Sequence, residues 1–165
     1  MTTTMRDAVF IACCACLAFA SGCGKDEKTI STPRGEVRIT QKGGGASMEM
    51  VTKDGKVNIT SNEKGVALPD NFPKDVPIIK GGVVTMAMAS GEHLSVHLRA
   101  PSPVAETAKY YEDSLKAQGW QIEATMNMGE SMMVSAKKGR RECAVTAVKD
   151  GNGSVVQLMV PREGS

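Results

Sequence analysis

The chain has 165 residues, of which 41% are hydrophobic and 23% are charged, and its formal net charge is +2. This balance suits a globular module of one or two small domains. Aromatic residues make up only 4% of the chain, too few to supply both a core and a base-stacking platform, so the composition argues against a nucleic-acid-binding protein.

Residues 1–22 are predicted to be a signal peptide of the lipoprotein type. Arg6 precedes an unbroken apolar segment, residues 8–20. The length of this segment fits the apolar region of a secretory signal, and it falls short of the roughly 18 residues needed to span a bilayer. A signal peptide is therefore favoured over a transmembrane helix.

Two cleavage sites are compatible with the residues that follow. Cleavage after Ala20 would use an ordinary A-x-A site and release a soluble protein. Alternatively, Ala20-Ser21-Gly22-Cys23 resembles the lipobox of bacterial lipoproteins, although the family usually has Leu or another aliphatic residue at the position of Ala20. The second interpretation is favoured, because small residues, a cysteine and a charged segment rarely occur together in this order by chance.

The lipobox resemblance implies that Cys23 becomes the lipid-modified N-terminus and anchors the protein in the cell envelope. Several acyl chains, which this class carries, give stable membrane attachment. Gly24 in place of Asp implies sorting to the outer membrane, facing the periplasm, if the host has two membranes.

Cys143 is the other cysteine of the processed chain, since Cys13, Cys14 and Cys16 lie in the removed segment. Lipid on Cys23 would leave Cys143 alone, whereas cleavage after Ala20 would permit a disulfide between the two. Cys143 lies in the apolar stretch ECAVTAV and is expected to be a small core residue without a nucleophilic role, because no histidine is placed to activate it.

Residues 23–34 are polar and charged and are predicted to form a flexible tether. Residues 35–66 contain three runs that alternate in the two-residue period of strands, which predicts a small β module. Between the last two runs, Asp54-Gly55 predicts a type I′ hairpin. With these two residues as the loop, Met50 pairs with Ile59, and the apolar side chains share one face.

Residues 67–82 carry Pro69, Pro73 and Pro77 and are predicted to be an extended linker. Their sequence LPDNFPKDVPIIKGG, followed by two strands and KYYEDSLKAQGW, resembles a domain that recurs in poorly characterised bacterial lipoproteins. That pattern is roughly LPxxFPxDVPxxxGA, two strands and a helix ending FYxxxLxxxGW, and this chain departs from it at Gly82 and Tyr110. The resemblance covers about residues 68–160 and implies no established activity or catalytic residues.

Residues 83–161 are predicted to form an α+β domain. Two strands, residues 83–89 and 93–100, precede a helix that Ser102 caps, that begins at Pro103 and that ends at Gly119. Further strands follow. The predicted fold class is α+β, a mostly antiparallel sheet covered by one helix in the order ββαββββ, preceded by the small β module. The predicted buried stripe of the helix is Val104, Ala108, Tyr111 and Leu115.

The sequence contains no recognisable catalytic motif, and we expect no catalytic residues, no enzyme activity and no cofactor. A basic cluster occurs near the C-terminus. It is typical of a solvated hairpin turn, with contact to an anion such as a phosphate-rich lipid or a polysaccharide as the less favoured alternative. The cluster consists of Lys137, Lys138, Arg140 and Arg141.

Methionines spaced by two residues are the remaining chemical signal, and Met86, Met88 and His97 are weak candidates for a metal site. Thioethers bind Cu(I), but the same spacing is typical of a core-facing strand. A three-residue loop, residues 90–92, would place Met86 opposite Val96 in the core. A two-residue loop would place Met86 opposite His97 on the outside, and the three-residue loop is favoured because it gives the apolar residues apolar partners.

The functional prediction is a lipid-anchored protein of the cell envelope that acts as a non-catalytic binding or assembly module. Its expected partners are the membrane, through the N-terminal lipid, and another envelope protein. A periplasmic Cu(I)-handling protein is the alternative, and an enzyme is the least favoured interpretation.

Overall fold

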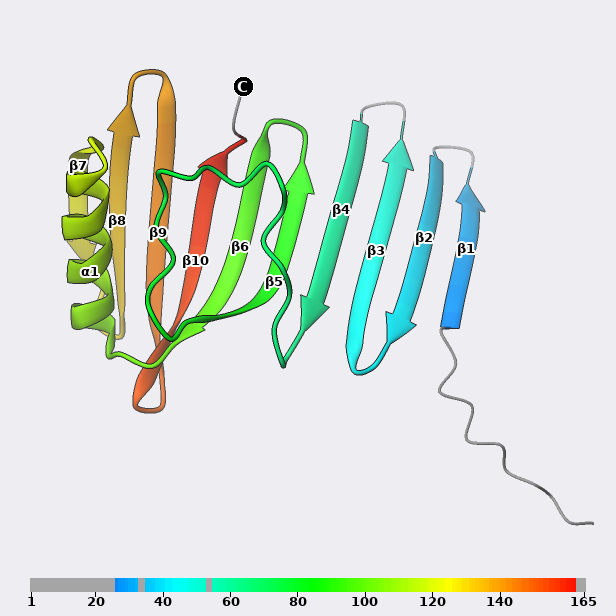
Figure 1. The fold of residues 1–165 in the computed structure, drawn as a ribbon, viewed down its shortest axis with the longest axis horizontal. Coiled ribbons are helices and arrows are strands. Elements are labelled where there is room, and N and C mark those ends of the chain that lie inside the picture. The colour runs from blue at the N-terminus through cyan, green and yellow to red at the C-terminus, as the bar shows by residue number, and fades with distance from the viewer. Residues whose placement is uncertain (1–25, 33–34, 53–54, 163–165) are drawn as a thin grey trace, which may run out of the picture.

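A computed structural model describes residues 26–32, 35–52 and 55–162. Their strands form one antiparallel sheet of ten strands, in the order β1-β2-β3-β4-β5-β6-β10-β9-β8-β7 (Figure 1). In chain order the elements are β1 (Asp26–Thr32), β2 (Gly35–Lys42), β3 (Gly45–Thr52), β4 (Gly55–Asn62), β5 (Val83–Ser90), β6 (His93–Ala100), α1 (Val104–Ala117), β7 (Gln121–Asn127), β8 (Ser131–Lys138), β9 (Arg141–Asp150) and β10 (Gly153–Pro161).

The strand order follows from the connections. Strands β1 to β4 are successive antiparallel neighbours, and residues 63–82 lead from β4 to β5, which pairs with β4. Helix α1 then carries the chain from β6 to the far edge of the sheet, where β7 begins. Strands β8, β9 and β10 return toward the middle, so that β10 pairs with β6 and completes the sheet.

Helix α1 ends as the sequence predicts and begins differently. Gly119 has a φ of +82°, and the backbone N–H groups of Gly119 and Trp120 donate to the carbonyls of Lys116 and Leu115. This pattern is a Schellman motif, in which glycine adopts the left-handed conformation. At the other end the predicted Ser102 cap is wrong: the N-cap is Pro103, and no side chain caps the helix. The Ser102 carbonyl instead accepts hydrogen bonds from two hydroxyl groups.

The core lies between one face of the sheet and two covering segments, α1 and residues 63–82. We call this face of the sheet the helix face, and the opposite face the open face. The covering segments contribute Phe72, Val76, Ile79, Ala108, Tyr111 and Leu115, and Trp120, just after α1, joins them. The strands contribute Val84, Ala87, Ala89, Leu94, Val96, Leu98, Ala100, Val134, Ala136, Cys143, Val145, Ala147, Val156, Leu158 and Val160.

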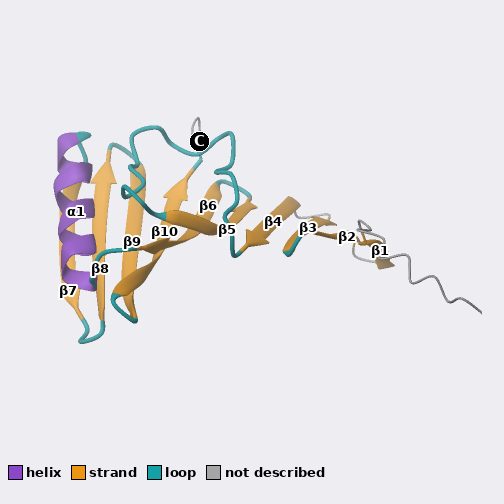
Figure 2. Ribbon diagram, turned by 60° about the horizontal axis from the view of Figure 1, so that its bottom comes forward, coloured by secondary structure: helices purple, strands orange, loops and turns teal. Residues whose placement is uncertain are grey.

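The predicted fold class is wrong. The small β module does not stand apart from a helix-covered sheet, because β4 pairs with β5 and the strands of both parts belong to one sheet. The helix has 14 residues and packs mainly on β7 to β10, while β1 to β4 extend from the other end of the sheet (Figure 2). Pairing satisfies the backbone groups of β5, which would otherwise form an exposed edge beside β6.

Two local expectations also differ from the structure. The segment predicted as a tether contains β1, which pairs with β2 along its whole length. The predicted hairpin pairing is wrong by two residues: Met50 lies opposite Val57, and Met48 lies opposite Ile59. Gly55, expected in the loop, is the first residue of β4 and has a φ of +140°. Because side chains alternate with a period of two, a shift of two residues keeps the same side chains on the same face.

Candidate functional site

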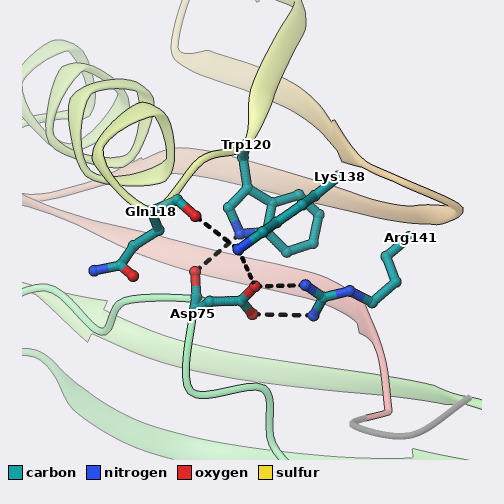
Figure 3. Close-up of polar contacts among 5 residues, drawn as sticks. All are labelled: Asp75, Gln118, Trp120, Lys138 and Arg141. Atoms are coloured by element: carbon teal, nitrogen blue, oxygen red, sulfur yellow. Dashed lines mark hydrogen bonds and ion pairs between the residues drawn. The ribbon is translucent and has the colours of Figure 1, made fainter.

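Asp75, in the segment between β4 and β5, lies at the centre of a polar cluster (Figure 3). Its carboxylate accepts hydrogen bonds from two guanidinium nitrogens of Arg141, at 3.0 and 2.5 Å, and from Lys138 Nζ at 2.8 Å. Lys138 also donates to the carbonyl oxygen of Gln118, the C-cap of α1, at 2.7 Å. The guanidinium carbon of Arg141 lies 4.9 Å from the ring centroid of Trp120. This Asp75 cluster therefore joins three separate segments of the chain.

The electrostatics of the cluster favour the charged carboxylate. The pKa of Asp75 is lowered from 3.8 to about 2, chiefly by the hydrogen bond from Arg141 and in addition by Lys138. The Asp75 side chain is 21% exposed, so the charges are partly shielded from water and interact more strongly than a surface pair. An external anion would compete with an internal carboxylate for Lys138 and Arg141.

The structure separates the four residues of the predicted anion contact. Lys138 and Arg141 bind Asp75. The ammonium of Lys137 lies 3.8 Å from a carboxylate oxygen of Glu142, and Arg140 is exposed in the turn between β8 and β9. Anion contact stays a prediction, and Lys137 and Arg140 are the residues whose charges face the solvent.

The proline-containing motif, residues 68–82, and the helix motif, residues 109–120, lie against each other at the Asp75 cluster. The indole N–H of Trp120 donates to the carbonyl of Asp75 at 2.9 Å, and the hydroxyl of Tyr110 donates to the carbonyl of Ile78 at 3.1 Å. Each bond runs from the helix motif to the proline-containing motif. Sequence reasoning did not single out Asp75, although the aspartate in the pattern was the available signal. These residues hold the linker against the helix, which is a structural role.

A β-bulge in β5 decides which way its methionines face. Val84 lies opposite Leu98, but the register then shifts, and Met86 lies opposite His97. The unpaired residue is Thr85, whose hydroxyl donates to the carbonyl of His97 at 3.4 Å. Because one extra residue reverses the alternation, the bulge turns Met86 and Met88 away from the helix face.

The expected three-residue loop between β5 and β6 is therefore wrong. Ser90 pairs with His93, which leaves a loop of two residues, and Ala87 and Ala89 take the core positions opposite Val96 and Leu94. The small alanine side chains fill the core positions beneath residues 63–82, and the large thioether side chains lie on the other face of the sheet.

Met86, Met88 and His97 consequently share the open face. All three are half-buried, although no helix of the described chain packs on this side. Ser95, on β6, lies opposite Met88 of β5 on one side and opposite Met159 of β10 on the other, and its exposure is only 6%. Long thioether side chains on both sides of a small serine account for this burial on an otherwise uncovered face.

The described residues offer little for acid–base or nucleophilic chemistry. Cys143 is 2% exposed, and burial raises the pKa of its thiol to about 12, which keeps it protonated and unreactive. His93 and His97 are four residues apart on one strand, about 13 Å from each other. In the part of the chain that the structure describes, no group of three or more His, Cys, Asp or Glu residues is placed to hold a metal ion.

The candidate lipidation site, Cys23, lies outside the described residues, as does the predicted signal peptide. Within residues 26–32, 35–52 and 55–162, no helix is long and apolar enough to cross a membrane. The membrane anchor stays a prediction from the sequence.

Comparison with known proteins gives one similarity. Residues 83–154 match a family model described as START domain-like. The matched region runs from the first residue of β5 to the second residue of β10 and includes α1, and it amounts to less than half of the chain. No curated protein and no solved structure matches the chain significantly.

Proposed function

We propose that this protein is a lipid-anchored component of the cell envelope that acts as a non-catalytic binding or assembly module for another envelope protein. The observation that carries this proposal is the open face of β2 to β5. Paired strands place apolar side chains side by side there, and no helix of the described chain packs on these strands. The side chains are Val37, Ile39, Met48, Met50, Val57, Ile59, Met86 and Met88.

A continuous apolar strip of this kind supports a protein partner. Contiguous apolar surface on a folded protein marks an interaction site more often than a chance feature. Methionine is over-used at surfaces that accept varied partners, because its unbranched side chain adapts to the opposing shape. The opposite side of β4 differs, since Asn58 and Thr60 alternate with Val57 and Ile59 and are exposed.

The position of β1 supports attachment close to a membrane. Only three residue steps separate Cys23 from Asp26, where β1 begins, so that connection spans at most about 10 Å. Strand β1 is one edge of the sheet and β7 is the other. Nine strand spacings of about 4.8 Å give a reach of up to about 43 Å from the edge near Cys23 to the helix end. An anchored sheet would thus lie within about 55 Å of the membrane surface, where another envelope protein can reach its open face.

The anchor is tested by labelling cells with a clickable fatty acid. We expect the label on the wild-type chain and its loss in Cys23→Ser, together with a shift of the protein from the membrane to the soluble fraction. Cys143→Ser is the matched control and should keep the label, because that cysteine is buried in the core. A labelled Cys23→Ser chain, or a mature N-terminus at Ser21, would contradict lipid anchoring.

The partner surface is tested separately by photo-crosslinking in cells. A photoreactive amino acid at Ile59 should give a discrete crosslinked product, because this side chain lies on the open face. The same amino acid at Asn58, its neighbour on the opposite side of β4, is the control. Crosslinking of one envelope protein from position 59 alone would support the proposal, and equal products from both positions, or none, would refute it.

A further inference from the structure

We propose that Met86, Met88 and His97 form a binding site for a soft monovalent metal ion, Cu(I), on the open face of the sheet. This inference goes beyond the proposed function and does not depend on lipid attachment or on a protein partner. It rests on the register of β5 and β6, which brings two thioethers and one imidazole together on one surface.

The register sets the spacing of the three side chains. Met86 and His97 are directly opposite each other on paired antiparallel strands, so their Cβ atoms lie about 5 Å apart. Met88 follows Met86 by two residues on the same side, about 7 Å along the strand, and is a diagonal neighbour of His97. Each methionine has three rotatable bonds, so both sulfur atoms can turn toward the imidazole and reach one ion.

The donor set determines the metal. Thioether sulfur is a soft, neutral ligand that selects Cu(I), and imidazole is compatible with copper. Calcium and magnesium require oxygen ligands, which these residues lack. The immediate cross-strand neighbours add no charge, so nothing beside the site favours a divalent cation. These neighbours are Ile59, Ser61, Ser95 and Gln157.

The imidazole of His97 is free to bind. Among the described residues it makes no hydrogen bond or ion pair, whereas its neighbour Gln157 donates to the Ser95 hydroxyl at 3.5 Å. Half-burial among long side chains limits the access of water without closing the site. The β-bulge at Thr85 is directly beside the Met86–His97 pair, and bulges are over-represented where a strand re-aims a functional side chain.

Methionines in the core would be explained by packing alone, but Met86 and Met88 do not lie in the core. Had β5 continued without the bulge, Met86 and Met88 would lie opposite Val96 and Leu94 on the helix face, where a methionine is an ordinary packing residue. In the structure those positions belong to Ala87 and Ala89. Packing of the core therefore does not account for two large thioethers beside a histidine.

The test is anaerobic Cu(I) titration of the full chain in competition with a chromophoric Cu(I) chelator. Accessible thiols are first blocked with N-ethylmaleimide, because free cysteines bind Cu(I) themselves, while Cys143 is buried. We expect one Cu(I) per chain with a Kd tighter than about 1 μM. No binding tighter than that would overturn the site.

Matched variants assign the ligands. Met86→Leu, Met88→Leu and His97→Gln should each weaken binding by at least about tenfold. The controls are Met133→Leu on β8 and His93→Gln at the first residue of β6, which change the same residue types on the same face. Both variants should bind Cu(I) as the wild type does. Equal losses in the controls, or wild-type binding in the three ligand variants, would refute the assignment.

A direct readout covers the case in which a variant folds poorly. The redox-stable ion Ag(I) is added to the wild-type chain carrying ¹³C-labelled methionine methyl groups. The resonances of Met86 and Met88 should shift at one equivalent of silver, and the resonance of Met133 should not. Unchanged methyl resonances for Met86 and Met88 would refute the site, whatever the variants do.

Discussion

Replacing Asp75 by asparagine should destabilise the protein in a manner that depends on pH. The substitution keeps the size of the side chain and the backbone carbonyl that accepts the hydrogen bond from Trp120. It removes the charge that Arg141 and Lys138 bind, and it leaves these two cations close together. The free energy of unfolding should therefore fall at neutral pH.

The magnitude follows from the pKa. A decrease from 3.8 to about 2 corresponds to at most about 2.4 kcal/mol, since one pKa unit is about 1.4 kcal/mol. Partial exposure of the Asp75 side chain reduces this value through screening, so we expect a loss of about 1–2 kcal/mol at pH 7. A lowered pKa means that the unfolded chain binds the proton more readily. The stabilisation is thus complete above about pH 5 and disappears between about pH 4 and pH 2.

The assay is urea denaturation between pH 2 and pH 7, followed by the fluorescence of Trp120, the only tryptophan of the chain, which packs in this cluster. The difference between wild type and Asp75→Asn should shrink as the pH falls through the pKa of Asp75. The control is Asp113→Asn, which removes an exposed ion pair with Lys109 on the helix and should change stability little. A difference that stays constant from pH 7 to pH 2, or one that is largest at pH 2, would refute the reasoning.

Two further predictions concern buried side chains, and a third concerns a close approach between strands. Native Cys143 should resist N-ethylmaleimide at pH 8, because burial raises the pKa of its thiol to about 12, and it should react once urea unfolds the protein. Mass spectrometry measures the labelling, and a label on Cys143 in the native protein would contradict the prediction. Leu115→Ala should cost about 2–5 kcal/mol in urea denaturation, since the side chain is 0% exposed, and a loss below about 1 kcal/mol would argue against the helix packing. Gly153→Ala should lower stability by about 1–3 kcal/mol, because its Cβ would lie 2.4 Å from the Ala100 carbonyl oxygen; an unchanged midpoint of thermal unfolding would count against this contact.

Local signals predicted the elements that depend on nearby residues. The helix was expected to end at Gly119, and the Schellman motif confirms this, because a glycine in the left-handed conformation needs only its own turn. The strand predicted at residues 93–100 is also confirmed as β6, in which Leu94, Val96 and Leu98 are buried in the core. Both features depend on a few consecutive residues, so the sequence alone is enough to predict them.

Local sequence patterns did not predict the contacts between segments that lie far apart in the chain. The pairing of β4 with β5 joins strands separated by residues 63–82, and no local pattern states which strand edge will accept which partner. Asp75 likewise meets Lys138 and Arg141 across 63 and 66 residues of the chain. The basic cluster and Asp75 were both visible in the sequence, but the pairing of Asp75 with Lys138 and Arg141 was not.

The sequence by itself indicated the helix and most of the strands, although it missed β1, and it raised the expectation of an anchor at Cys23. Only the tertiary structure decided that one sheet holds all the described strands and that Met86 and Met88 face away from the core. Methionine suits a core and an outer surface equally, and a single extra residue at Thr85 reverses the alternation of the strand. Packing decided which face the methionines take, because Ala87 and Ala89 fit into the core beneath residues 63–82 and Met86 and Met88 therefore lie beside His97 on the open face.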